Sequence, residues 1–454
     1  MCDKMQVMKE RRINKIMSIQ GKQSTLNKSD NVRKKAGRRW VMLGVLSLGV
    51  AFNYLDRSTL SIALPQIVKD IHMSPAVTGV ILSGFFWSYV IFQLPAGYIG
   101  DKIGPRLTQG FASIIWGLST ALNAFSRGFV SFFGLRFVLG AAESPLYTSG
   151  SKAIKEWFPK KERSFASGTF NNASKLGGTV ATPLLAVLIT AIGWRLSFIV
   201  VGSIAAIWGF IWLKFYRTPR QYDSITKEEL DLIESDQEEV MGNVSRELPK
   251  YAVAKLFKQK TMWCMMIGFF AINFVSYFFF TWFPTYMINT YHLKLLTFGF
   301  IGILPGIAAI IGGWIGGIVC DQLYRKGYST TVSRKVPLIV GLLLSCVIGL
   351  AAISHNIWFT LTVLCIANGA ATGAGSVVWT LPADVAPNSN MIGTIGGVQN
   401  AAANLSGIVC PILIGVLLGI NNSYTLPFII SGIVALIGAL AYLIMPKLEP
   451  MKLH

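Results

Sequence analysis

Twelve apolar runs, each about as long as a membrane is thick, dominate this chain of 454 residues. A helix that crosses a bilayer needs about 20 apolar residues. The runs lie at 40–64, 77–99, 107–125, 130–151, 165–189, 194–214, 262–288, 296–319, 336–354, 358–380, 392–419 and 424–445. Only 14% of the residues are charged, against about 25% in an ordinary soluble domain. The sequence predicts an all-α membrane protein and argues against a soluble enzyme or a nucleic-acid-binding protein.

Lysine and arginine are distributed unevenly between the two sets of loops. The loops of one side hold only Lys69, Arg127, Arg195 and Lys294, although the chain has 41 basic against 21 acidic residues. Cytoplasmic loops carry the excess of Lys and Arg in membrane proteins. We therefore expect the other, basic side to be cytoplasmic, with both termini on it. The expected location is the plasma membrane, that is, the inner membrane of a bacterium.

The segments outside the runs divide the chain into parts. We expect a basic cytoplasmic tail at 1–39, six-helix bundles at 40–214 and 261–446, a cytoplasmic loop at 215–260 and a tail at 447–454. The first tail has no apolar core of a secretory signal, and Met17 is an alternative start. Within the central loop, 227–240 is either a short acidic surface helix or, the interpretation we favour, a solvated linker.

A short loop motif occurs once in each half. GYIGDKIGPR follows the second run and GIVCDQLYRKG follows the eighth, with Asp101 and Asp321 220 positions apart. Glycine allows helices to approach closely, and the aspartate can cap a helix or pair with an arginine. A generic tight turn is the alternative, but the matching positions favour two parallel six-helix repeats. We expect a conformational gate formed by Gly97, Asp101, Arg106, Gly317, Asp321 and Arg325.

Five ionisable residues lie inside the runs, and all are in the first half: Asp56, Arg57, Arg136, Glu143 and Lys175. Charges inside a membrane are costly and usually functional. A low-dielectric environment favours the neutral form of a carboxyl group, whereas a nearby cation favours the charged form. A carboxylate beside an arginine can therefore alternate between ion pair and protonated acid, and the arginine fork suits an anionic substrate. The alternative is a set of structural ion pairs between helices.

The second half has neutral polar residues in its runs instead. Asparagine, serine and aromatic side chains suit the recognition of hydroxyl groups, although they also join helices. These residues are Asn273, Tyr277, Ser376, Trp379, Gln399, Asn400 and Asn404. The six cysteines and four histidines form no metal-binding pattern. We expect no metal, no cofactor and no enzymatic activity.

The repeated loop and the 6+6 arrangement resemble the major facilitator superfamily, over about residues 40–445. Further motifs are similar to its anion:cation symporter family, which includes bacterial sugar-acid carriers. They are Asn53–Arg57 (NYLDR), Phe86–Tyr89 (FWSY), Gln93–Gly97 (QLPAG), Arg136–Pro145 (RFVLGAAESP), Glu156–Arg163 (EWFPKKER) and Thr281–Pro284 (TWFP). This chain looks most like the group of D-galactonate transporters.

The resemblance implies roles for particular residues. Asp56 and Glu143 are expected to couple transport to protons, and Arg136 to link the substrate to Glu143. The substrate would be bound by side chains from both halves: Tyr54, Arg57, Tyr89, Arg136, Ser174, Lys175, Ser376, Trp379 and Asn400.

The chain departs from the galactonate pattern at Ser174, where that pattern has glutamine, and Lys175 follows it. Lys175 is expected to bind a second carboxylate, to shift selectivity, to extend toward the membrane surface, or to pair with Asp56 or Glu143. These four alternatives leave open whether the substrate has one carboxylate or two.

The implied function is import of a sugar acid of the hexonate, hexuronate or glucarate type by proton symport and alternating access. The expected partners are a small organic anion, protons and the lipid bilayer, with no nucleic acid, and the expected state is a monomer. The alternatives are a proton-coupled drug or metabolite antiporter and, more remotely, a membrane receptor or sensor that does not transport. Sodium remains open as the coupling ion.

Overall fold

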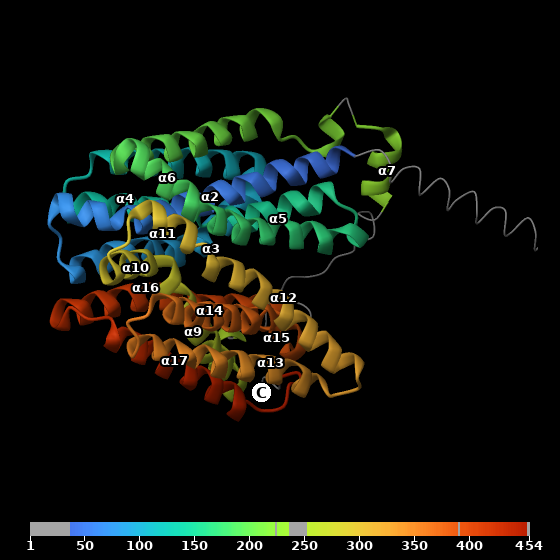
Figure 1. The fold of residues 1–454 in the computed structure, drawn as a ribbon. Helices are drawn as coiled ribbons and strands as arrows, with labels where there is room; N and C mark the ends of the chain where they lie inside the picture. The colour runs from blue at the N-terminus through green and yellow to red at the C-terminus, as the bar shows by residue number, and fades with distance from the viewer. Residues whose placement is uncertain (1–36, 223–224, 236–251, 389–390, 452–454) are drawn as a thin grey trace, which may run out of the picture.

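The computed structural model describes residues 37–222, 225–235, 252–388 and 391–451. Within these residues every regular element is a helix. Figure 1 shows two helical bundles, the first from blue to green and the second from yellow to red. The tail up to residue 36 with Met17, the loop at 236–251, the end of the chain at 452–454 and the side chain of Asp101 lie outside the description.

The first bundle contains five helices, which together provide six membrane crossings. They are α2 (Arg38–Ile71), α3 (Pro75–Leu122), α4 (Phe129–Glu143), α5 (Leu146–Trp157) and α6 (Lys160–Phe215). Two of them turn sharply at a glycine: φ is 79° at Gly104 in α3 and 76° at Gly193 in α6. Positive φ values strain residues that have a β-carbon. Each glycine therefore separates two crossings where the sequence predicted two runs.

The second bundle has six crossings, several of which are made of two pieces. The elements are α9 (Lys260–Thr281), α10 (Phe283–Tyr291), α11 (Leu295–Ile301), α12 (Leu304–Arg325), α13 (Thr330–Ser345), η4 (Cys346–Ala352), α14 (Ile357–Val378), α15 (Leu381–Val385), α16 (Ile392–Asn421) and α17 (Thr425–Ile444). Pro284, Pro305 and Pro382 lie in the first turn of α10, α12 and α15. Proline lacks an N–H donor and is tolerated best in that turn. The runs predicted as single helices are broken there.

Nine stretches of the described chain are long and apolar enough to cross a membrane. One of them is the 56-residue α6, which contains two crossings. With α6 counted twice, these stretches give ten crossings. The other two of the twelve predicted crossings are the second part of α3 and α2, whose middle contains Asn53, Asp56 and Arg57. The predicted all-α fold with two six-helix bundles is confirmed.

The two bundles repeat the same turn in the backbone. α2 is followed by His72 and α10 by His292, both in the left-handed conformation with φ of 54° and 51°. New helices begin three residues later, at Pro75 and at Leu295. The offset is 220 residues, the same as between Asp101 and Asp321. We call this end of the molecule the His72 end, and the opposite end, where α3 turns, the Gly104 end.

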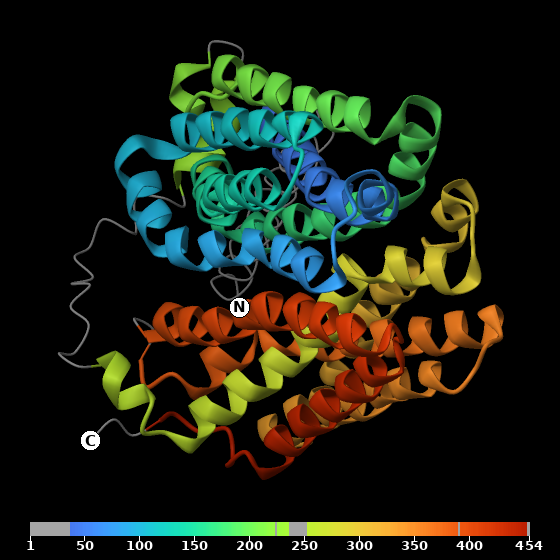
Figure 2. The same cartoon turned by 90° about the vertical axis from the view of Figure 1, so that its left-hand side faces the viewer.

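Close contacts between the bundles lie from the middle of the molecule toward the His72 end. A β-carbon on Gly79 of α3 would collide with the backbone of Pro411 in α16, and one on Gly415 would collide with Pro75. Such small residues let helix backbones approach in membranes. In Figure 2 the red α16 faces the blue α3, and the yellow α11 lies beside the first bundle, where it contacts α6.

The central loop contributes a helix, α7 (Lys227–Ser235), that packs on the first bundle. Its Glu229 is only 5% exposed and accepts hydrogen bonds from the backbone N–H groups of Arg38 and Arg39, at 3.0 and 3.2 Å. The first N–H groups of a helix have no partner within the helix, and a carboxylate there also complements the helix dipole. The expectation of a solvated linker is therefore wrong for 227–235.

Candidate functional site

A buried ion pair between Arg57 and Glu143 lies in the middle of the first bundle. Arg57 Nη2 and Nε donate to Glu143 Oε2 at 2.7 and 3.2 Å. Glu143 has no exposed surface and Arg57 is 12% exposed. Removing one partner of a buried pair costs about 3–5 kcal/mol, because the other charge remains without compensation. The two residues come from α2 and from the last position of α4, so they hold these helices in register.

Aromatic rings surround the Arg57 guanidinium. Its carbon lies 4.3 Å from the centre of the Phe85 ring, 5.0 Å from Tyr54 and 5.6 Å from Tyr89. Arginine over an aromatic face is stabilised by the ring quadrupole, more so away from water. The Tyr54 and Tyr147 hydroxyls are 3.1 Å apart. The predicted Tyr54, Arg57 and Tyr89 are thus brought together.

Sequence reasoning missed Phe85 and Tyr147. Phe85 directly precedes the FWSY motif, and Tyr147 lies four positions after Glu143. The second spacing corresponds to one helical turn, which is a signal that the sequence did contain. However, the helix is broken between α4 and α5, at residues 144–145. The position of Tyr147 relative to Glu143 therefore depends on the tertiary structure.

Asp56 and Asn53 are buried without hydrogen-bond partners among the described residues. They are 2% and 0% exposed, and neither oxygen of Asp56 and neither polar atom of Asn53 has a partner. Glu143 Oε1 is unpaired as well. Buried polar groups normally bond to protein or to ordered water. The unpaired carboxyl oxygens of Asp56 and Glu143 are therefore candidates for proton binding.

Arg136 supports the cluster through the backbone. Its Nη1 and Nη2 donate to the carbonyl oxygen of Arg57, both at 3.5 Å, and its side chain is 4% exposed. Within the described residues it makes no direct hydrogen bond to Glu143. Arg136 thus contacts the backbone of Arg57, and its expected role in linking the substrate to Glu143 stays a prediction.

The predicted residues of the second bundle make contacts within that bundle. Ser376 Oγ donates to the Gly373 carbonyl at 2.7 Å, and the Trp379 ring packs against Phe269 and is 58% exposed. Asn400 is half-buried. No contact in the described chain joins these three residues to Arg57.

A different polar pair of the second bundle meets the first bundle. The Tyr277 hydroxyl donates to Asn404 Oδ1 at 3.1 Å, and the Tyr277 ring lies 4.5 Å from that of Phe86. Phe86 in turn contacts Phe85, whose ring is 5.1 Å away and covers Arg57. Tyr277 and Asn404 are thus connected to the Arg57 cluster through two phenylalanine rings.

Lys175 is directed toward the second bundle. A β-carbon on Gly313 of α12 would lie 3.1 Å from Lys175 Nζ. Among the described residues Lys175 has no ion pair, so the alternative in which it pairs with Asp56 or Glu143 is not observed. The neighbouring Ser174 Oγ donates to the Asn171 carbonyl at 2.6 Å.

The gate residues make no contact between the bundles in the described part of the chain. Arg106 Nε donates to the carbonyl of Leu213 in its own bundle at 2.8 Å. Asp321 and Arg325 are exposed, and Gly97 and Gly317 are half-buried. Among the described gate residues, the one polar side-chain contact, from Arg106, thus stays within its own half.

Comparison with known proteins identifies the family. The model of the Major Facilitator Superfamily matches residues 46–332 and 327–453. The chain is 34% identical to the probable galactarate/D-glucarate transporter GudP of Escherichia coli (strain K12), over 92% of this chain and 95% of that protein. It is also 34% identical to the D-galactonate transporter of Escherichia coli O6:H1, over 91% and 97%.

A solved structure shows the same fold. The crystal structure of a bacterial homolog to the human lysosomal transporter Spinster, in an inward-facing and unoccupied conformation, superposes with a TM-score of 0.73. It shares 16% identity and covers 90% of this chain and 96% of that one. Together with the sequence relatives, this comparison shows that the chain belongs to the Major Facilitator Superfamily and is a multi-pass membrane transporter, not an enzyme.

Proposed function

We propose that this protein imports a sugar-acid anion of the hexonate, hexuronate or glucarate type by proton symport. The observation that carries the proposal is the buried Arg57–Glu143 pair beside the unpaired carboxyl of Asp56. The names of the relatives support the substrate class, since they are transporters of galactarate, D-glucarate and D-galactonate. The proposed setting is a monomer in the bacterial inner membrane with both termini in the cytoplasm.

Arg57 is the proposed ligand of the substrate carboxylate. Its planar guanidinium can bind a carboxylate through two hydrogen bonds, but its edge with Nε and Nη2 is occupied by Glu143. A proton on Glu143 removes the charge that holds Arg57. The guanidinium is then free to bind the substrate, so proton binding and anion binding favour one another.

Asp56 is the proposed second proton site. Its two oxygens have no partner in the described chain, although an ionised carboxylate at such depth needs one. Arg136 and Glu143 lie within electrostatic range of it, so its charge depends on theirs. Two protons entering with a monoanion would move one net positive charge and make import electrogenic.

The conformational cycle follows from the contacts between the bundles. The glycine contacts close the His72 end in this conformation, whereas among the described side chains of the gate residues no hydrogen bond or ion pair joins the two halves at the Gly104 end. The distribution of basic residues assigns the Gly104 end to the cytoplasm. This state is therefore the proposed inward-facing one, and rocking of the bundles about the central site would open the His72 end.

Uptake into vesicles containing the purified protein tests the proposal. Labelled galactarate, glucarate, galactonate and glucuronate are supplied with an inward proton gradient, with a sodium gradient, and with neither. Proton-driven accumulation that is lost in Asp56→Asn is the expected result. Accumulation driven by sodium alone would reassign the coupling ion. No uptake of any acid, together with proton release on addition of cationic drugs, would favour an antiporter instead.

A further inference from the structure

Two adjoining pockets lie between the bundles at the His72 end. The first has a volume of about 270 Å³ and lies between α2 and the connection from α10 to α11. The second, of about 470 Å³, extends from the same face of α2 toward the start of α17. They share Pro65 and Lys69. Both are remote from the Arg57 cluster along α2, because Lys69 is three turns beyond Arg57.

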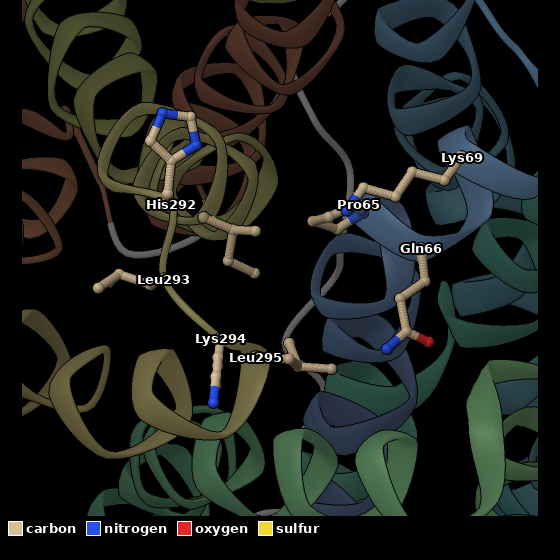
Figure 3. Close-up of a pocket in the computed structure, with 8 residues that line it drawn as sticks. Pro65, Gln66, Lys69, His292, Leu293, Lys294 and Leu295 are labelled. Atoms are coloured by element: carbon tan, nitrogen blue, oxygen red, sulfur yellow. The ribbon is translucent and has the colours of Figure 1, made fainter.

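The first pocket is flanked by a lysine from each bundle. Figure 3 shows Lys69 and Gln66 on α2 at one side of the pocket and Lys294, before α11, at the other. Both lysines are exposed, and neither has an ion-pair partner among the described residues. The acidic neighbour of Lys69 does not neutralise it, because Asp70 binds Trp194 Nε1 at 2.7 Å and Arg195 at 3.4 Å.

The lining of both pockets favours an anion. None of the described residues that form them is acidic. Neutral donors complete the second pocket: Thr78, Thr285, Asn289, Ser354, Asn422, Ser423 and Tyr424.

Only four basic residues occur in the loops on this side of the protein, and two of them, Lys69 and Lys294, line the first pocket. Like charges from opposite bundles repel when the His72 end closes, and a bound anion removes that repulsion.

We propose that Lys69 and Lys294 form an outer anion site, which binds the carboxylate of the substrate before it reaches Arg57. The inference rests on the proposed import of a sugar acid and adds a second site to it. When the His72 end opens, the two lysines flank the mouth from opposite sides. A localised positive potential raises the local concentration of an anion and its rate of association, and salt screens this effect over about 8–10 Å.

The test compares initial uptake rates at low and high ionic strength. The variants are Lys69→Gln/Lys294→Gln and the charge-preserving Lys69→Arg/Lys294→Arg. The matched control is Arg127→Gln, which removes one charge from the same side, is exposed, and lines neither pocket. The substrate is the sugar acid that the wild-type protein takes up best, measured over a range of concentrations to separate KM from the maximal rate.

The double glutamine variant should lower the ratio of maximal rate to KM about fivefold at low salt, through KM alone, and less than about twofold near 0.3 M salt. The arginine variant and Arg127→Gln should stay within about twofold of wild type. An unchanged KM in the double glutamine variant, with normal wild-type uptake, would overturn the outer site and leave the proposed function standing. An equal loss in Arg127→Gln would also overturn it, because the effect would then come from net charge. Absence of uptake by the wild type would instead overturn the proposed function.

Discussion

The two bundles have the same fold and different chemistry. The first contains Arg57, Glu143, Asp56 and Arg136 at its centre, all at most 12% exposed. At the corresponding depth the second bundle has the neutral Tyr277–Asn404 pair. A duplicated fold therefore does not imply a duplicated site: among the described residues, the buried charged groups at the centre lie in the first half.

This difference has a physical consequence for movement. A buried ionised group that loses its partner costs several kcal/mol. Since Arg57 and Glu143 lie within one bundle, the bundles can separate without breaking the pair. The contacts that must break are apolar or neutral, such as Phe86 against Tyr277. In the proposed transport cycle, the bundles can therefore move apart without leaving a buried charge unpaired.

Arg57→Ala should have the largest effect. It removes the proposed carboxylate ligand and leaves Glu143 buried without its cation, so we expect loss of substrate binding by more than about 100-fold and destabilisation of about 3–5 kcal/mol. Binding to the purified protein and thermal unfolding measure the two effects. The double variant Arg57→Met/Glu143→Gln should recover stability but not binding. Retained affinity in Arg57→Ala would move the carboxylate site elsewhere.

Glu143→Gln should separate coupling from transport. The amide cannot release a proton but has the shape of the protonated acid, so accumulation against a gradient should be lost while exchange of internal for external substrate continues. Counterflow and net uptake in the same vesicles measure the two activities. Uphill accumulation by this variant would show that Glu143 is not the coupling residue. Asp56→Asn is the companion variant for the second carboxyl.

Tyr277→Phe tests the neutral half of the site. It removes one hydrogen bond, to Asn404, which contributes about 0.5–1.5 kcal/mol. We therefore expect uptake to fall less than about tenfold, with proton coupling intact. A loss as large as that of Arg57→Ala would show that the second bundle is as important for binding as the first. The matched control is Tyr286→Phe, whose hydroxyl lies 3.4 Å from that of Tyr291 within the second bundle.

Glu229→Gln should have the smallest effect, on stability alone. The carboxylate also accepts a bond from Arg39 Nη1 at 3.0 Å, and Arg39 Nε donates to Glu162 at 2.8 Å, so α7 is tied to the starts of α2 and α6. Arg39 keeps its ion pair with Glu162 in this variant, so the expected cost is that of losing a charged helix cap, about 1 kcal/mol. The thermal unfolding midpoint should fall by a few degrees, with KM unchanged. A change in KM would indicate that the central loop influences the transport site.

Several features were predictable because they depend only on local sequence. The twelve crossings follow from hydropathy, the repeat from the spacing of Asp101 and Asp321, and the asymmetry of charge from counting ionisable residues within the runs. The breaks at Pro145, Pro284, Pro305 and Pro382 were missed. A proline inside an apolar run is compatible with either a kinked helix or two helices, and neighbouring helices decide between them.

The sequence by itself determined the family, the crossings and the residue types available for chemistry, because hydropathy and motifs act over a few turns of one helix. Only the tertiary structure decided which of these side chains bind one another. That Arg57 binds Glu143 while Arg136 binds the Arg57 carbonyl depends on how α2 and α4 are rotated about their axes. The same holds for Lys175 facing Gly313 and for Lys69 and Lys294, which line one pocket from opposite bundles. These contacts join residues far apart in the chain, so packing rather than local pattern sets them.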